Sequence, residues 1–100
     1  MQKKVYKTRA KVWLYPGSTA AWHFIFVDKK YAKELKEKFG KVKRGFGSIP
    51  VVATIGKTSW QTSIFPDKRA GTYLLPLKLK VRQAEHFASG DTITFFVQVR

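Results

Sequence analysis

The sequence predicts a mainly β protein, a small β pseudobarrel of about six strands with two short helices. Three observations predict it. Segments of alternating polar and apolar residues recur along the chain, β-branched and aromatic side chains are concentrated in them, and turns containing glycine or proline separate them. With 100 residues, of which 44% are hydrophobic and 15% aromatic, the chain suffices for one modest core. We therefore expect a single domain over residues 1–100.

The first expected strand spans residues 4–15, where two kinds of side chain alternate. One face is mostly apolar, and the other carries the basic residues Lys7, Arg9 and Lys11. A period of two with one charged face is typical of a half-buried strand. A turn at residues 16–18 breaks the pattern, and residues 20–27, which are apolar on nearly both faces, predict a central second strand.

A helix is expected over residues 29–39. Asp28 is a suitable N-cap, and apolar side chains then recur at helical spacing from Tyr31 to Phe39, with lysines at most of the other positions. Gly40 is placed to end this helix, because glycine adopts the backbone conformation that commonly follows a last helical turn.

Most of the second half is expected to be strand. The segments from Ile49 to Ile55 and from Ser59 to Phe65 are rich in β-branched and aromatic residues, and a turn at Gly56-Lys57-Thr58 joins them. The remaining expected elements are a loop at residues 66–72, a strand at 73–77, a short helix at about 79–88 and a final strand at 91–99.

Six short motifs occur in a fixed order in the middle and C-terminal parts of the chain. They are Gly47-Ser48-Ile49-Pro50-Val51, Thr54-Ile55-Gly56, Trp60-Gln61-Thr62-Ser63-Ile64-Phe65-Pro66, Tyr73-Leu74-Leu75-Pro76-Leu77-Lys78, Val81-Arg82-Gln83-Ala84 and Gly90-Asp91-Thr92-Ile93. In this order and at these spacings they resemble the small bacterial domain family DUF1905, over residues 5–100. The resemblance implies a double-split β-barrel, the broad architecture of the AbrB-like transition-state regulators. The family has no known function and implies no substrate, cofactor or catalytic residue.

The chain is strongly basic, with 20 lysine and arginine residues against six acids and a formal charge of +14. This balance favours negatively charged partners. Cysteine is absent, which excludes disulfides, thiolate metal sites and thiol catalysis. The most apolar run, residues 20–27, has eight residues and is interrupted by His23, far short of the roughly 20 that span a membrane. We expect a cytoplasmic protein that does not contact membranes.

Catalysis and metal binding are not expected. The only histidines are His23 and His86, and the acids are too scattered to complete a metal site with them. Glu34 and Glu37 lie on one lysine-rich helix, where local ion pairs are the expected role. Gly56-Lys57-Thr58 lacks the glycine and the following helix that a phosphate-binding loop needs. No cofactor is expected, and the predicted role is non-catalytic binding of an anionic ligand or a protein partner.

A candidate anion site lies at the start of the second expected helix, where Lys78, Lys80 and Arg82 gather. Three cations at this end of a helix repel its dipole and one another, and an anion relieves that repulsion. Trp60 and Ser63 are candidates to complete the site. The alternative hypothesis pairs Lys78 and Arg82 with nearby acids and places Trp60 in the core. The acids concerned are Asp67, Glu85 and Asp91.

A second hypothesis is nonspecific nucleic-acid binding by the first half of the chain. Residues 1–44 hold 13 basic and 3 acidic residues, a net charge of +10. The candidate contacts are Lys7, Arg9, Lys11, Lys41, Lys43 and Arg44. Such binding weakens steeply with salt. Against it, 15 of the 20 cations are lysines and no known nucleic-acid motif is present, so a solvated basic surface stays an open alternative. Monomer and homodimer also both stay open.

Overall fold

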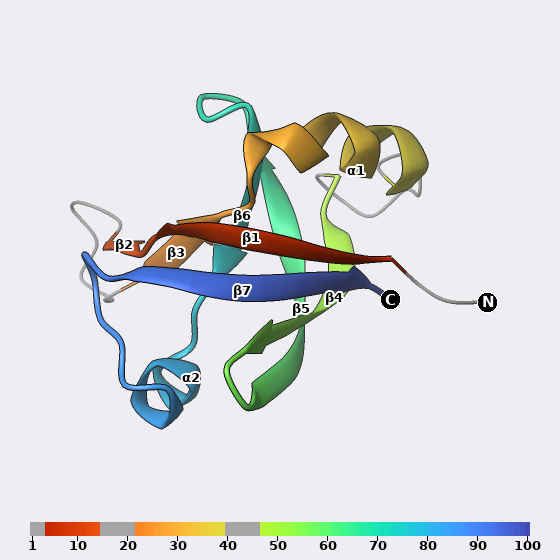
Figure 1. Ribbon diagram of the computed structural model, residues 1–100. Coiled ribbons are helices and arrows are strands. Elements are labelled where there is room, and N and C mark those ends of the chain that lie inside the picture. The colour runs from red at the N-terminus through yellow and green to blue at the C-terminus, as the bar shows by residue number, and fades with distance from the viewer. Residues whose placement is uncertain (1–3, 15–21, 40–46) are drawn as a thin grey trace.

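The computed structural model describes residues 4–14, 22–39 and 47–100. It confirms the expected class, because seven antiparallel strands form a nearly closed barrel with two short helices (Figure 1). The strands follow one another across the sheet in the order β1-β7-β4-β5-β6-β3-β2. Their bounds are β1 Val5–Lys11, β2 Trp13–Leu14, β3 His23–Phe26, β4 Ile49–Ile55, β5 Thr58–Asp67, β6 Thr72–Pro76 and β7 Thr92–Val99.

The first expected strand is in fact two strands, which is why the barrel has seven rather than six. The chain leaves the β1 ladder at Val12, whose backbone N–H donates to the carbonyl of Asp91 and whose carbonyl accepts from Gly90, both at 2.8 Å. Beyond this residue β2 pairs with β3 instead of β7. The two outermost strands of the sheet, β1 and β2, are thus neighbours in the chain, and this continuity brings the edges of the sheet together.

Strand β5 belongs to both halves of the barrel. Its first part pairs with β4, from Thr58 opposite Ile55 to Ile64 opposite Ile49, and its last three residues pair with β6. The expected loop at residues 66–72 was therefore too long. The turn is short because the Asp67 carboxylate accepts hydrogen bonds from the backbone of the two residues that follow Lys68, at 2.9 and 3.2 Å.

The first helical segment begins where the sequence predicted. Asp28 caps it by accepting a hydrogen bond from the backbone N–H of Lys30, at 3.1 Å. A single 3-10 turn, η1 (Lys29–Tyr31), leads into α1 (Ala32–Phe39). Leu35 is fully buried, so α1 packs its apolar side on the barrel and leaves its lysines outside.

A network around Glu34 holds α1 to β1. Its carboxylate accepts hydrogen bonds from Lys4 Nζ at 2.8 Å and from the hydroxyl of the buried Tyr6 at 2.5 Å, and Lys38 Nζ lies 3.7 Å away. These donors and charges lower the pKa of Glu34 to about 2. Burial and the contact with Glu34 raise the pKa of Tyr6 well above its ordinary value. The local ion pairs expected for Glu34 are confirmed, and Lys4 adds a partner from outside the helix.

The second helix is shorter than predicted. Helix α2 (Leu79–Ala84) ends because His86 adopts a left-handed backbone conformation, with φ +56°. The chain then folds back, and the N–H of Phe87 donates to the carbonyl of Arg82 at 3.2 Å. Phe87 is buried, but it reaches the core from this turn and not from a helical face.

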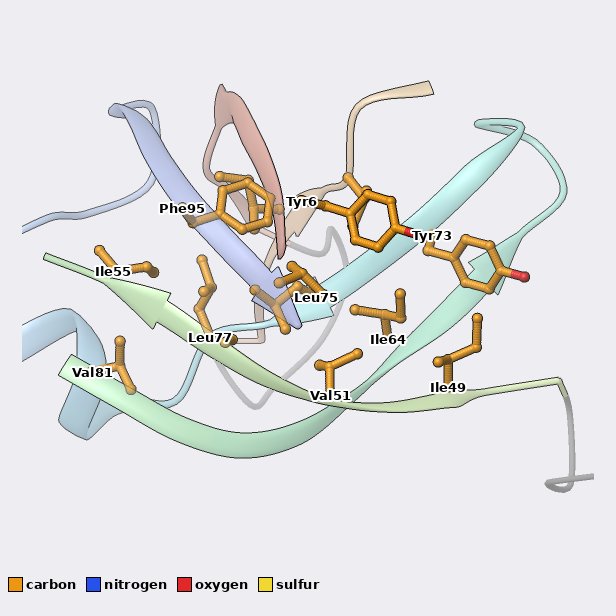
Figure 2. Packing of buried hydrophobic residues seen from close by; sticks show 14 of the residues in the cluster. Tyr6, Ile49, Val51, Ile55, Ile64, Tyr73, Leu75, Leu77, Val81 and Phe95 are labelled. Atoms are coloured by element: carbon orange, nitrogen blue, oxygen red, sulfur yellow. The ribbon is translucent and has the colours of Figure 1, made fainter. Parts of the chain in front are cut away.

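The core fills the barrel along its whole length (Figure 2). Alternate residues of β4, Ile49, Val51, Ala53 and Ile55, face inward, and Figure 2 shows the cluster extending from Tyr73 at one end to Val81 of α2 at the other. Helices α1 and α2 lie on opposite sides of the strands (Figure 1). The protein therefore has two distinct ends, one beside α1 and one beside α2.

Candidate anion-binding site

A pocket of about 260 Å³ lies beside α2, where that helix meets the ends of β3 and β6. The pairing of β3 with β6 builds it. Phe24 stands opposite Pro76, and the N–H of Leu77 donates to the carbonyl of His23 at 2.9 Å, which extends the ladder by one residue. The lining residues are Trp22, His23, Pro76, Leu77, Lys78, Leu79 and Arg82.

Arg82 forms the polar wall of this pocket. It is half-buried, its Nε donates to the carbonyl of Leu77 at 3.3 Å, and its Nη1 lies 3.5 Å from Nε2 of His23. Backbone and imidazole groups therefore hold the guanidinium in place. A guanidinium presents its donors in a rigid planar fork, and such a fork suits a carboxylate or a phosphate.

The carboxylates of the chain are all engaged elsewhere. All six acids lie within the described residues, and the described ion pairs, which involve Asp28, Glu34 and Glu37, include neither Lys78 nor Arg82. The three acids named in the alternative hypothesis have other partners. Asp67 accepts from its own turn, Glu85 accepts from the Thr58 hydroxyl at 2.6 Å, and Asp91 accepts from the N–H of Ala88 at 2.9 Å. The predicted pairing of Lys78 and Arg82 with these acids was wrong.

Apolar side chains stand exposed at the mouth of the pocket. Trp22 is 55% exposed and Leu79 is 56% exposed. The Trp22 ring stacks on that of Phe24, with centroids 6.3 Å apart and an interplanar angle of 9°. A rigid aromatic face next to a cation is suited to a ligand that has an apolar group beside its negative charge.

The structure brings together only part of the predicted anion site. Lys78 and Arg82 line the pocket, whereas Lys80 is exposed on α2 and lies outside the lining. Trp60 packs against the core, as the alternative hypothesis had it, and its Nε1 is buried without a hydrogen-bond partner among the described residues. Ser63 points to the other face of β5, opposite Pro50. An odd separation of three along one strand puts Trp60 and Ser63 on opposite faces.

Sequence reasoning missed Trp22 and His23. Both reach the pocket through the pairing of β3 with β6, which joins residues about 50 positions apart. The signal that was present is the position of Trp22 at the start of a strongly apolar segment. Which strand pairs with that segment is not encoded locally.

A family model, described as a domain of unknown function (DUF1905), matches residues 9–97. The chain belongs to the DUF1905 family. No curated protein matches the sequence. The match covers every strand of the barrel in whole or in part. It also covers α1, α2 and the seven residues that line the pocket.

The basic residues predicted to contact nucleic acid lie partly on the outer face of this DUF1905 barrel. Lys7, Arg9 and Lys11 are exposed along β1, and they stand opposite Phe96, Thr94 and Thr92 of β7. The other three candidates, Lys41, Lys43 and Arg44, lie outside the described residues.

Two further features of the DUF1905 chain concern metals and membranes. Within residues 4–14, 22–39 and 47–100, no three of the side chains that commonly ligate metals gather closely enough to hold an ion. None of the helices in the same ranges is long and apolar enough to cross a membrane.

Proposed function

We propose that this DUF1905 domain is a non-catalytic binding module and that its pocket beside α2 holds an anionic ligand through Arg82 and Lys78. One observation carries the proposal. Arg82 is a half-buried cation that lines a pocket, and no carboxylate of the chain neutralises it. A cation withdrawn from water without a counter-ion is costly, and a bound anion removes that cost.

The ligand is a small organic anion with an apolar group. Its carboxylate or phosphate meets the fork of Arg82, with Lys78 as a second charge, and its apolar part rests on Trp22 and Leu79. A volume of about 260 Å³ is slightly below the roughly 300–1,000 Å³ of common ligand pockets, which favours a ligand no larger than a substituted aromatic acid.

NMR titration with benzoate and phenyl phosphate tests this proposal. We expect amide shifts confined to the lining residues, and a loss of affinity of tenfold or more in Arg82→Gln. Arg69→Gln is the matched control, because Arg69 is exposed in the β5–β6 turn and its loss lowers the net charge equally. Equal affinity of Arg82→Gln and the natural protein refutes the proposal, as does equal weakening in both variants.

A second candidate function is nucleic-acid binding on the outer face of β1, β7, β4 and β5. The residues that lie side by side across these strands favour it. One row runs from Lys7 through Phe96 and Thr54 to Ser59. The neighbouring row consists of Val5, Gln98, Val52 and Gln61, so neither row contains an acid. Phe96 is 36% exposed beside Lys7, and a ring next to cations suits a stacked base and its phosphates.

Fluorescence anisotropy with labelled oligonucleotides between 25 and 300 mM salt tests this second candidate. We expect binding that weakens as salt rises, and a shallower salt dependence in the triple variant Lys7→Gln/Arg9→Gln/Lys11→Gln. The control triple variant Lys57→Gln/Arg69→Gln/Lys80→Gln removes the same charge from elsewhere on the surface. Absence of binding at the lowest salt, or the same loss in both triple variants, refutes this candidate.

A further inference from the structure

A groove of about 610 Å³ lies between α1 and the turn that joins β5 to β6, away from α2 and the pocket described above (Figure 1). Ala32 of α1, Pro66 and the ring of Tyr73 form its apolar lining, and Gly47 and Gly71 lie along it. Its volume is more than twice that of the pocket beside α2, and it falls within the range of small-molecule sites.

Four lysines surround this apolar lining. Lys29, Lys33 and Lys36 recur at helical spacing along η1 and α1, and Lys68 comes from the β5–β6 turn. Asp67 is the one acid among the described lining residues, so their formal charge is four positive less one negative, or +3.

Little of this positive charge is neutralised within the protein. The Nζ atom of Lys33 lies 3.9 Å from Glu37, a loose and largely exposed pair, and no carboxylate in the described residues pairs with Lys29, Lys36 or Lys68. The Asp67 carboxylate is occupied by the backbone N–H groups of its own turn. The groove therefore carries a net positive potential over an apolar surface.

Tyr73 adds a hydroxyl donor to the groove. The residue is 5% exposed, and its hydroxyl points away from the rest of the core cluster (Figure 2). No described residue hydrogen-bonds to this hydroxyl, whereas the hydroxyl of the adjacent Thr72 donates to the carbonyl of Val27 at 2.8 Å. Burial raises the pKa of Tyr73, so the hydroxyl keeps its proton at neutral pH. This hydroxyl lines the groove and has no acceptor among the described residues, so it can donate a hydrogen bond to a ligand.

We propose that this groove binds a nucleoside diphosphate or triphosphate. The phosphates lie among the four lysines and accept a hydrogen bond from the Tyr73 hydroxyl, and the base rests on the apolar lining. Lysine ammonium groups act as point charges that suit phosphate oxygens, and a charge of +3 is close to the opposite of the about three or four negative charges that a free nucleoside diphosphate or triphosphate carries at neutral pH. This site is separate from the pocket at Arg82, and it does not depend on the function proposed for that pocket.

Titration with fluorescent N-methylanthraniloyl-ADP at 50 mM salt, followed by displacement with unlabelled compounds, tests the proposal. We expect ADP and ATP to displace the probe, adenosine not to displace it, and inorganic tripolyphosphate to displace it more weakly than ATP. Tripolyphosphate that competes as well as ATP overturns the role of the base, and no probe binding at millimolar protein overturns the site.

Four variants locate the probe on the molecule. We expect the double variant Lys36→Gln/Lys68→Gln to weaken binding at least tenfold. Tyr73→Phe, which keeps the ring and its packing, weakens it about fivefold at an unchanged urea midpoint. The control Lys57→Gln/Lys80→Gln removes equal charge from two exposed lysines outside the groove and changes binding less than twofold. Arg82→Gln leaves binding unchanged. Equal loss in both double variants, full affinity of Tyr73→Phe, or a loss in Arg82→Gln each overturns the assignment.

Discussion

Replacing Gly56 with alanine tests how the β4–β5 hairpin is joined to α2. Gly56 and Lys57 form a two-residue loop, because Ile55 stands opposite Thr58. Gly56 has φ +57°, and Lys57 has no positive φ. A two-residue hairpin loop with positive φ only at its first position has the geometry of a type II′ turn, which requires glycine there. A Cβ atom at this position also meets Oε1 of Glu85 at 2.0 Å, so the Glu85 side chain has to move.

The expected loss of stability has two parts. The strained backbone conformation of alanine costs about 1–3 kcal/mol. Displacement of the Glu85 carboxylate also breaks the hydrogen bond that it accepts from the Thr58 hydroxyl. This hydrogen bond is 2.6 Å long and partly buried, and it contributes about 1 kcal/mol. We therefore expect Gly56→Ala to lower the free energy of unfolding by roughly 2–4 kcal/mol, or by about 10–25 °C in melting temperature for a domain of this size.

Urea unfolding followed by tryptophan fluorescence measures this change. Gly71→Ala is the matched control, because Gly71 has φ +71° but open space around it, and we expect it to cost about 1 kcal/mol. In a Glu85→Ala background the cost of Gly56→Ala falls by about 1 kcal/mol, since the hydrogen bond is already absent. Equal costs of Gly56→Ala in the two backgrounds, or a cost no larger than that of Gly71→Ala, refute the reasoning.

Three further variants test the contacts of α1 and β6. Glu34→Gln lowers the melting temperature at pH 7. Because the pKa of Glu34 is depressed in the folded protein, its carboxylate contributes its full stabilisation above pH 4.5 and loses it as the pH falls toward 2. The difference in melting temperature between Glu34→Gln and the natural protein should therefore disappear over that range. A difference in melting temperature that persists at pH 2 contradicts this. Leu35→Ala removes a fully buried side chain and costs about 2–5 kcal/mol in urea unfolding; a cost below 1 kcal/mol contradicts its place in the core. Thr72→Val leaves the carbonyl of Val27 without its donor and costs about 1–3 kcal/mol in the same assay, whereas an unchanged midpoint shows that this hydrogen bond is not needed.

Features that depend on neighbouring residues were predictable from the sequence. The cap at Asp28, the turn at Gly56 and the inward face of β4 each follow from a few adjacent side chains. The second helix was drawn too long because its apolar spacing continues to Phe87, while the left-handed backbone of His86, which ends it, has no reliable sequence signal. Local patterns thus define where elements begin better than where they end.

Features that depend on distant pairing were not predictable. The break at Val12 is set by hydrogen bonds to Gly90 and Asp91, nearly 80 residues further along the chain. The pocket beside α2 depends in the same way on His23 and Arg82, which are 59 residues apart. The sequence indicated Lys78 and Arg82 because they are close together in the chain, but the side chains that complete their pocket come from β3.

Net charge alone does not distinguish a binding residue from a solvated one in this protein. An isolated exposed lysine such as Lys57, which lines neither the pocket nor the groove, keeps its hydration and by itself indicates no partner. Arg82 and the hydroxyl of Tyr73 differ. Arg82 is half-buried, and no carboxylate of the chain pairs with it. The Tyr73 hydroxyl lines the groove, and no described residue accepts its hydrogen bond. The unpaired charge of Arg82 lowers the stability of the empty domain, and an anion bound there removes that cost. A phosphate in the groove at the other end accepts the hydrogen bond that the Tyr73 hydroxyl offers. Binding at each of the two ends should therefore raise the melting temperature, and the variants Arg82→Gln and Tyr73→Phe should each abolish or reduce that rise only for the ligand of their own end.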